Sequence, residues 1–226
     1  MGRTEQLQAA DGHRFDVYRA DAVAPIKGSV VVLQEAFGVN AHIGAVCDDY
    51  AARGYHAVAP ALYDRQQRDA AFGYDETSLQ QARTLRRGLD YEKVLLDVDA
   101  VVASLRDAGR VNVVGYCVGG SAAWLAACRL RIDAASCYYP SDIAKQLDEQ
   151  PRCPVIMHFA ARDHFIVKAT VEQFAAKHPD VPAFLYAADH GFNCAQREQG
   201  YDDASARLAL TRTLALFEKR AVPRQP

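Results

Sequence analysis

The sequence lacks several features that would assign it to a specialised class of protein. It has no excess of basic side chains, because 26 Lys and Arg stand against 28 Asp and Glu and the formal net charge is −2. Such a chain offers no cationic surface to phosphate backbones or anionic lipids, so we expect it to bind neither nucleic acid nor membranes. It also has no apolar run of about 18 residues, the length that a membrane-spanning helix requires.

Short cysteine spacings and an export signal are absent as well. The six cysteines are scattered along the chain and form no CxxC pair, which argues against a zinc site. The first six residues are polar and have no apolar core of a signal peptide. Scattered single cysteines in such a chain are typical of reduced thiols. We therefore expect a cytoplasmic protein without a zinc site.

The composition is that of a globular protein with a repeating strand and helix pattern. Half of its 226 residues are hydrophobic and 24% are charged, close to globular averages. No repeat, linker or low-complexity tract divides the chain, so we expect one domain over residues 1–226. Short runs rich in Val and Ala, each followed by a polar turn and a helical period, predict an α/β fold. Its sheet should be mostly parallel, with helices on both faces.

The order of the predicted elements follows from the same pattern. Residues 4–19, interrupted by Asp11-Gly12, predict an antiparallel hairpin at one edge of the sheet. Buried strands are predicted at 29–33, 56–59, 111–114, 154–159 and 183–186. Helices are predicted over 42–53, 78–88, 92–108, 118–129, 167–178 and 203–219. Residues 63–77, rich in Asp, Gln and Arg, predict an excursion at the surface.

The segment GYCVG at residues 115–119 is the most informative part of the sequence. It follows a predicted strand directly and precedes a predicted helix, which is the context of a nucleophile elbow with Cys117 in the place of serine. The N-terminus of that helix favours a thiolate. Most free cysteines are simply small buried side chains, but this context favours a nucleophile.

A base and an orienting acid should follow the nucleophile in the order acid, then histidine. Asp163 comes after the strand predicted at 154–159, and His190 after the strand predicted at 183–186. Both therefore belong to the carboxyl edge of the sheet, where open α/β sheets carry their sites. Their nearest rivals are His164 and Asp189. We interpret the remaining histidines as structural: His13, His42, His56, His158, His164 and His178.

Two backbone N–H groups should form an oxyanion hole beside the sulfur. Val118 follows the nucleophile and supplies the first, and Ala36, in the loop after the strand at 29–33, is the candidate for the second. The neighbouring Glu35 is a carboxylate at the end of an apolar run, where it needs a donor. A thiol or an arginine is the expected partner.

Several segments resemble the dienelactone hydrolase family within the α/β-hydrolase superfamily. The resemblance extends over residues 14–220 and rests on QEAFGVN (34–40), GY (54–55), APALY (59–63), GYCVGG (115–120), DHF (163–165) and HGF (190–192). It implies an α/β-hydrolase fold and a triad of Cys117, His190 and Asp163. It further implies that Glu35 keeps the resting thiol protonated until substrate moves the carboxylate. It implies no metal and no organic cofactor.

The resemblance departs from the family's pattern at the substrate-binding arginines. The type member holds a carboxylate with two arginines, one near the position of Leu79 or Gln80 here and one at the position of Cys194. Either Arg83 and Arg197 substitute from shifted positions, or the substrate has no carboxylate. The residues expected to line the pocket are Phe37, Tyr63, Tyr138, Tyr139 and Phe192.

The expected reaction is hydrolysis of a small ester or enol lactone through an acyl-enzyme on Cys117. The alternatives are a general carboxylesterase or thioesterase that takes uncharged acyl groups, and a non-catalytic binding or thiol-sensing protein. A comparison of the hydrolysis rates of aryl esters and of dienelactone distinguishes the general esterase or thioesterase from the expected enzyme. We expect a monomer or a small homo-oligomer.

Overall fold

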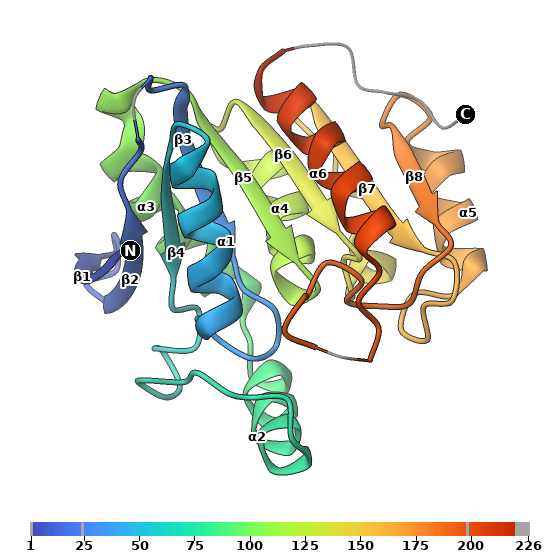
Figure 1. The fold of residues 1–226 in the computed structure, drawn as a ribbon, viewed down its shortest axis with the longest axis horizontal. Helices are drawn as coiled ribbons and strands as arrows, with labels where there is room; N and C mark the ends of the chain where they lie inside the picture. Colours follow the sequence, from blue (N-terminus) through green and yellow to red (C-terminus); the bar gives the residue numbers. More distant parts are fainter. Residues whose placement is uncertain (1, 24, 198, 220–226) are drawn as a thin grey trace.

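An eight-stranded sheet forms the centre of the computed structural model, which describes residues 2–23, 25–197 and 199–219 (Figure 1). The strand order is β1-β2-β4-β3-β5-β6-β7-β8. The strands are β1 (Arg3–Gln8), β2 (Arg14–Ala20), β3 (Gly28–Leu33), β4 (Tyr55–Pro60), β5 (Val111–Tyr116), β6 (Ala134–Tyr138), β7 (Val155–Ala160) and β8 (Ala183–Tyr186).

Strand direction and burial both follow the sequence pattern. β1 and β2 form an antiparallel hairpin, and β2 also pairs antiparallel with β4. From β4 to β8 all pairings are parallel. Every residue of β3, β5, β6 and β7 is buried, as expected for parallel strands that are covered on both faces.

Helices cover both faces of the sheet. In Figure 1, α1 and α6 lie in front of the strands, and α3 and α4 lie behind them. The side chains of Asn40, Asp75, Asp90 and Asp202 cap α1, α2, α3 and α6 by accepting backbone N–H groups of the first turn. The helices are α1 (Ala41–Ala52), α2 (Glu76–Arg87), α3 (Tyr91–Leu105), α4 (Val118–Arg129), α5 (Lys168–Lys177) and α6 (Asp203–Phe217), with short 3₁₀ turns at Arg106–Ala108 and Ile143–Lys145.

The predicted elements are confirmed apart from two differences. The strand β6 was missed, because its sequence AASCY is short and has small side chains instead of a run of Val. It completes the sheet between β5 and β7. The helix predicted over 92–108 is α-helical only to Leu105 and continues as a 3₁₀ turn to Ala108. Gly109, with a φ of 103°, then ends the helical segment.

The excursion after β4 carries α2 across the carboxyl ends of the strands. Its backbone is tied to the loop after β3, since Phe72 N donates to the Phe37 carbonyl at 2.8 Å and Gly38 forms a bridge with Ala71. It has a small apolar cluster of its own, built from Tyr63, Ala70 and Leu85. The excursion is therefore partly buried, which the sequence did not indicate.

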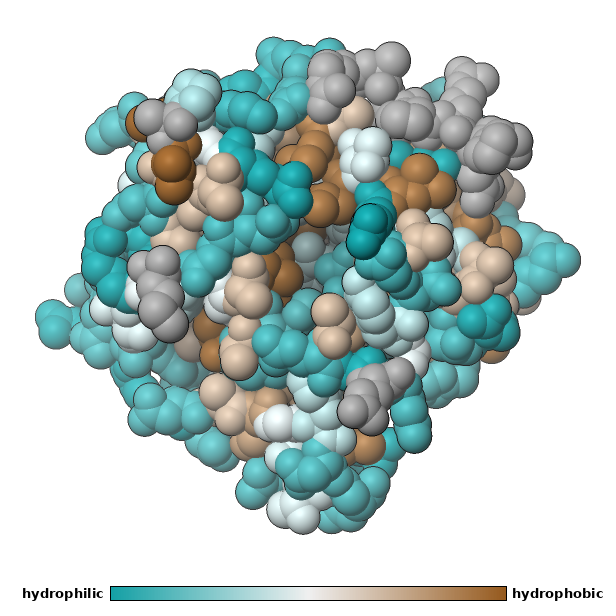
Figure 2. All heavy atoms as spheres, viewed as in Figure 1, coloured by the Kyte–Doolittle hydropathy of each residue, from teal (hydrophilic) through white to brown (hydrophobic). Residues whose placement is uncertain are grey.

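Hydrophilic side chains cover most of the face that carries α1 and α6, and hydrophobic atoms are visible mainly between the helices (Figure 2). Few large apolar side chains of the described residues are exposed. None of the helices described is long and apolar enough to span a bilayer.

Candidate active site

Cys117 lies at a sharp turn between β5 and α4. Its φ of 56° is in the left-handed region, which a non-glycine residue adopts only under strain. The turn leaves no room beside it: a Cβ on Gly115 would lie 1.9 Å from the Gly119 carbonyl oxygen, and one on Gly119 would lie 2.4 Å from the Gln34 carbonyl oxygen. These contacts explain why glycines flank the cysteine, and they direct the thiol into a cavity at the carboxyl edge of the sheet.

His190 and Asp163 meet at the ends of β8 and β7. His190 Nδ1 lies 2.7 Å from Asp163 Oδ2, and both residues are buried. The His190 ring packs between Tyr139 and Phe165, each with its ring centroid 4.8 Å away. The imidazole is thus held by one hydrogen bond and two ring contacts, as a base of fixed orientation requires.

The second nitrogen of His190 is available for proton transfer. His190 Nε2 is buried and makes no hydrogen bond to a described residue, and the ring lines the same cavity as Cys117. Burial by itself lowers the pKa of His190, but interactions with Cys117 and Asp163 outweigh this and raise it to about 10. The surroundings of His190 therefore stabilise the charged ring, the form that it takes when it accepts a proton.

Two backbone N–H groups near the sulfur have no hydrogen-bond acceptor among the described residues: those of Val118 and Ala36. Val118 is the first residue of α4, where N–H groups lack partners within the helix. Ala36 lines the cavity, and its carbonyl accepts the Tyr63 hydroxyl at 3.1 Å. These two N–H groups are therefore the candidates for an oxyanion hole.

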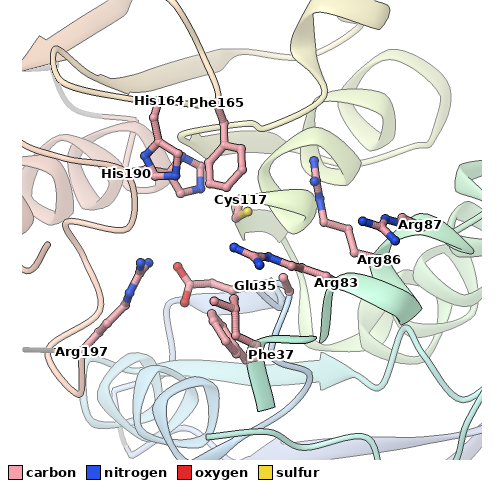
Figure 3. A pocket seen from close by; sticks show the side chains of 12 residues that line it. Glu35, Phe37, Arg83, Arg86, Arg87, Cys117, His164, Phe165, His190 and Arg197 are labelled. Carbon is pink, nitrogen blue, oxygen red and sulfur yellow. The ribbon is translucent and has the colours of Figure 1, made fainter. Parts of the chain in front are cut away.

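Glu35 has a different partner from those expected. Its Oε1 accepts the Tyr139 hydroxyl at 3.0 Å, so the donor is neither a thiol nor an arginine. Tyr139 follows β6, the strand that was missed, and its φ of 35° turns the chain toward the site. In Figure 3 the Glu35 carboxylate points away from Cys117, toward the side of the cavity where Arg197 lies.

The cavity has a volume of about 300 Å³ and an arginine-rich wall (Figure 3). Arg83, Arg86 and Arg87 enter from α2, and Arg197 enters from the loop after β8. Arg86 is anchored by Ser141 and Asp142. Neither Arg83 nor Arg197 forms an ion pair with a described carboxylate, so both are free to bind an anion.

Some predicted lining residues lie elsewhere. Phe37 lines the cavity, as do Arg83 and Arg197. Tyr138 and Phe192 do not, because they lie in the core, where the Tyr138 hydroxyl bonds Thr213 and the two rings face one another. Tyr63 is buried behind Ala36 and touches the site only through its hydroxyl.

Other residues that line the cavity were not predicted from the sequence. His164 and Phe165 do so beside His190, although His164 was interpreted as structural. Arg86 and Arg87 were missed, although Arg83, Arg86 and Arg87 have i, i+3, i+4 spacing on a predicted helix, which places them on one side. That spacing could have identified them.

One group of side chains in the described chain has the composition of a metal site. Glu35, His42 and Cys194 offer a carboxylate oxygen, an imidazole nitrogen and a sulfur that all lie within 4.8 Å of one another. All three residues are buried. The histidine had been interpreted as structural, and no sequence spacing linked the three.

Comparison with known proteins places the chain among its relatives. The model of the dienelactone hydrolase family matches residues 15–221. A carboxymethylenebutenolidase of Pseudomonas putida is 34% identical over 223 residues, which cover 92% of each chain. A solved structure from Klebsiella pneumoniae, assigned as a dienelactone hydrolase, is 29% identical, with a TM-score of 0.77 and coverage of 96% of this chain and 98% of that one.

More distant structures share the fold alone. An esterase from Pyrococcus furiosus is 14% identical, with a TM-score of 0.69 and coverage of 99% of this chain and 93% of that one. The α/β-hydrolase architecture therefore persists where little sequence identity remains. The family match and the sequence identity together show that this chain belongs to the dienelactone hydrolase family.

Proposed function

We propose that this protein hydrolyses a carboxylic ester or enol lactone through a thioester on Cys117. The observation that carries the proposal is the unpartnered His190 Nε2 in the cavity of Cys117, with Nδ1 of the same ring bonded to Asp163. Family membership supports the reaction class, since relatives are carboxymethylenebutenolidases.

In the first half of the reaction, His190 takes the proton of Cys117 and the thiolate attacks the carbonyl carbon. A carbon–sulfur bond forms, and the carbonyl electron pair moves to the oxygen, which the N–H groups of Val118 and Ala36 stabilise. The carbon–oxygen bond of the ester then breaks, and the leaving oxygen takes the proton from His190. The acyl group remains on sulfur.

In the second half, His190 removes a proton from water, and the resulting hydroxide oxygen attacks the thioester. The carbon–sulfur bond breaks, the acid leaves, and Cys117 and His190 return to their starting states. A thiolate is easily expelled from a tetrahedral intermediate, so the substrate needs a good leaving group. An enol lactone meets this need, whereas an amide does not.

The substrate carries a carboxylate that Arg83 and Arg197 bind. Both guanidinium groups line the cavity that holds Cys117, and both lack an ion pair with a described carboxylate. A guanidinium matches the planar geometry of a carboxylate. The shifted arginines either bind a substrate carboxylate or face a substrate that has none. The first explanation gives Arg83 and Arg197 a function, whereas an uncharged acyl group would leave both without one.

The test measures ring opening of dienelactone by its ultraviolet absorbance. We expect rapid opening by the wild type, a loss of about 10³-fold or more in kcat in Cys117→Ala, and an unchanged rate in the control Cys153→Ala, whose thiol is half-buried outside the cavity. A loss below about tenfold in Cys117→Ala would reassign the nucleophile.

Two other results would change the proposed function. If dienelactone is not opened but a neutral aryl ester is hydrolysed with dependence on Cys117, the mechanism stands and the carboxylate substrate is wrong. If no ester is hydrolysed and Cys117 forms a stable sulfenic acid, the protein is a thiol sensor.

A further inference from the structure

Three buried donor atoms face one another behind the cavity wall. They belong to Glu35 in the loop after β3, His42 in the first turn of α1, and Cys194 in the loop after β8. These residues are 4%, 5% and 0% exposed. The fold thus gathers an oxygen, a nitrogen and a sulfur from segments that are up to 159 residues apart in the sequence (194 − 35).

Two of the three donors have no partner in the described chain. Glu35 Oε2 and His42 Nε2 are both buried without a hydrogen bond. Nearly all buried polar side-chain atoms in proteins are paired. Two unpaired atoms on residues whose ligand atoms lie within 4.8 Å of one another therefore point to a missing ligand. A cation satisfies both at once, because each atom carries a lone pair and neither needs to donate.

We propose that Glu35, His42 and Cys194 form a binding site for a zinc-type divalent cation. Carboxylate oxygen, imidazole nitrogen and thiolate sulfur are the usual ligands of Zn²⁺. A thiolate and a carboxylate neutralise the two positive charges, so the occupied site carries no net charge in the protein interior. Binding breaks the S–H bond of Cys194, forms a zinc–sulfur bond and releases the proton to solvent.

The surrounding groups support the three ligands. The Tyr139 hydroxyl donates to Glu35 Oε1 at 3.0 Å, which leaves Oε2 for the cation. Cys194 Sγ lies 3.0 Å from the Tyr74 hydroxyl, which also accepts from Asn40 at 3.2 Å. Such outer hydrogen bonds orient the ligands of a metal site. Glu35 also lines the active-site cavity, which gives the cation a way in.

The proposed cation would hold Glu35 where it lies now, turned from Cys117. A zinc site at these three residues differs from the expectation of no zinc site, because that expectation rested on the spacing of cysteines along the chain. It does not depend on the reaction proposed for Cys117, because none of its three ligands is in the triad. Metal binding and ester hydrolysis can therefore succeed or fail separately.

The experiment titrates Zn²⁺ into metal-free protein by calorimetry. The full chain with Cys117→Ala is the starting protein, so that the active-site thiol cannot bind the ion. We expect one equivalent of Zn²⁺, and binding weakened more than about tenfold by Cys194→Ser or His42→Gln, since loss of a ligand exceeds the loss of an outer-shell group. Cys153→Ser is the matched control and should keep full affinity.

A second measurement guards against loss of folding in the variants. Co²⁺ in place of Zn²⁺ should give a thiolate-to-cobalt absorption band that Cys194→Ser removes, while circular dichroism of the metal-free variants stays unchanged. The proposal is overturned if the starting protein binds no Zn²⁺ saturably, if Cys194→Ser binds as tightly as Cys153→Ser, or if His42→Gln leaves the affinity unaltered.

Discussion

Asp163 uses both of its carboxylate oxygens to fix His190. Oδ2 lies 2.7 Å from His190 Nδ1, and Oδ1 accepts the backbone N–H groups of Phe165 and Ile166 at 2.8 and 3.0 Å. The loop after β7 therefore holds the carboxylate in place before it meets the histidine. Because Nδ1 is occupied in this way, Nε2 is the atom left for the cavity.

Replacing Asp163 by Asn should lower kcat on the preferred ester by about 10³- to 10⁴-fold, because an amide nitrogen in place of Oδ2 favours the wrong tautomer of His190. The measurement is steady-state kinetics with a Tm to show that the fold persists. Asp189→Asn is the matched control, since Asp189 is exposed and pairs with Arg162. Equal losses in both variants would contradict the orienting role of Asp163.

The charge of the His190 ring should depend on pH over an unusual range. Burial lowers its pKa, but Cys117 and Asp163 raise it from the ordinary 6.5 to about 10. Protonation of the ring therefore adds to the free energy of unfolding, and this contribution is complete below pH 6.5 and is lost as pH rises through about 10. We expect the NMR titration of the ring to show a midpoint near 10, and a lower one in Cys117→Ala. An equal midpoint in both proteins would remove Cys117 as a cause.

Tyr139→Phe should slow alkylation of Cys117 by iodoacetamide. In metal-free protein the variant removes the hydroxyl that donates to Glu35, so the carboxylate is free to approach the thiol and hold its proton. A hydrogen bond to a charged group contributes about 1.5 kcal/mol or more, so we expect a rate decrease of about tenfold.

Two further variants test this explanation. Adding Glu35→Gln to Tyr139→Phe should restore the alkylation rate, because the amide holds no charge against the sulfur. Tyr138→Phe should have no effect, since the Tyr138 hydroxyl bonds Thr213 in the core. If Tyr138→Phe slows alkylation as much, Glu35 is not responsible.

Arg83→Gln should lower kcat/KM for a carboxylate-bearing lactone by about 10- to 100-fold, the range of a lost charge-assisted hydrogen bond. A neutral aryl ester should be affected less than about threefold, because it makes no ion pair. Arg207→Gln is the control, since Arg207 is exposed on α6 and pairs with Asp203. Equal effects on both esters would show that Arg83 does not recognise charge.

Much of the sheet could be predicted because parallel strands are buried on both faces and their sequences are runs of Val and Ala. The segment GYCVG could be interpreted for a similar reason, since the close contacts at Gly115 and Gly119 admit no side chain. Cys117, Asp163 and His190 follow the ends of three strands, so their meeting at one edge was foreseeable from chain order.

Other parts of the site could not be predicted from the sequence, because they depend on which strands are neighbours in the sheet. β6 has small residues and gave no signal, so the approach of Tyr139 to Glu35 could not be foreseen. The same holds for His42 and Cys194, which meet Glu35 only in the folded chain. Tyr138 and Phe192 were misplaced because aromatic residues near strand ends pack equally well into a core.

If Arg83 binds the substrate as proposed, the excursion after β4 carries substrate recognition on a segment of its own, apart from the residues of the reaction. Its helix α2 supplies Arg83, Arg86 and Arg87, while its own small cluster of Tyr63, Ala70 and Leu85 supports it apart from the main core. Substitutions in this segment would then alter which acyl group is accepted while leaving the elbow and the loops of Asp163 and His190 in place. Diversification of substrate range among related chains should therefore concentrate in this segment.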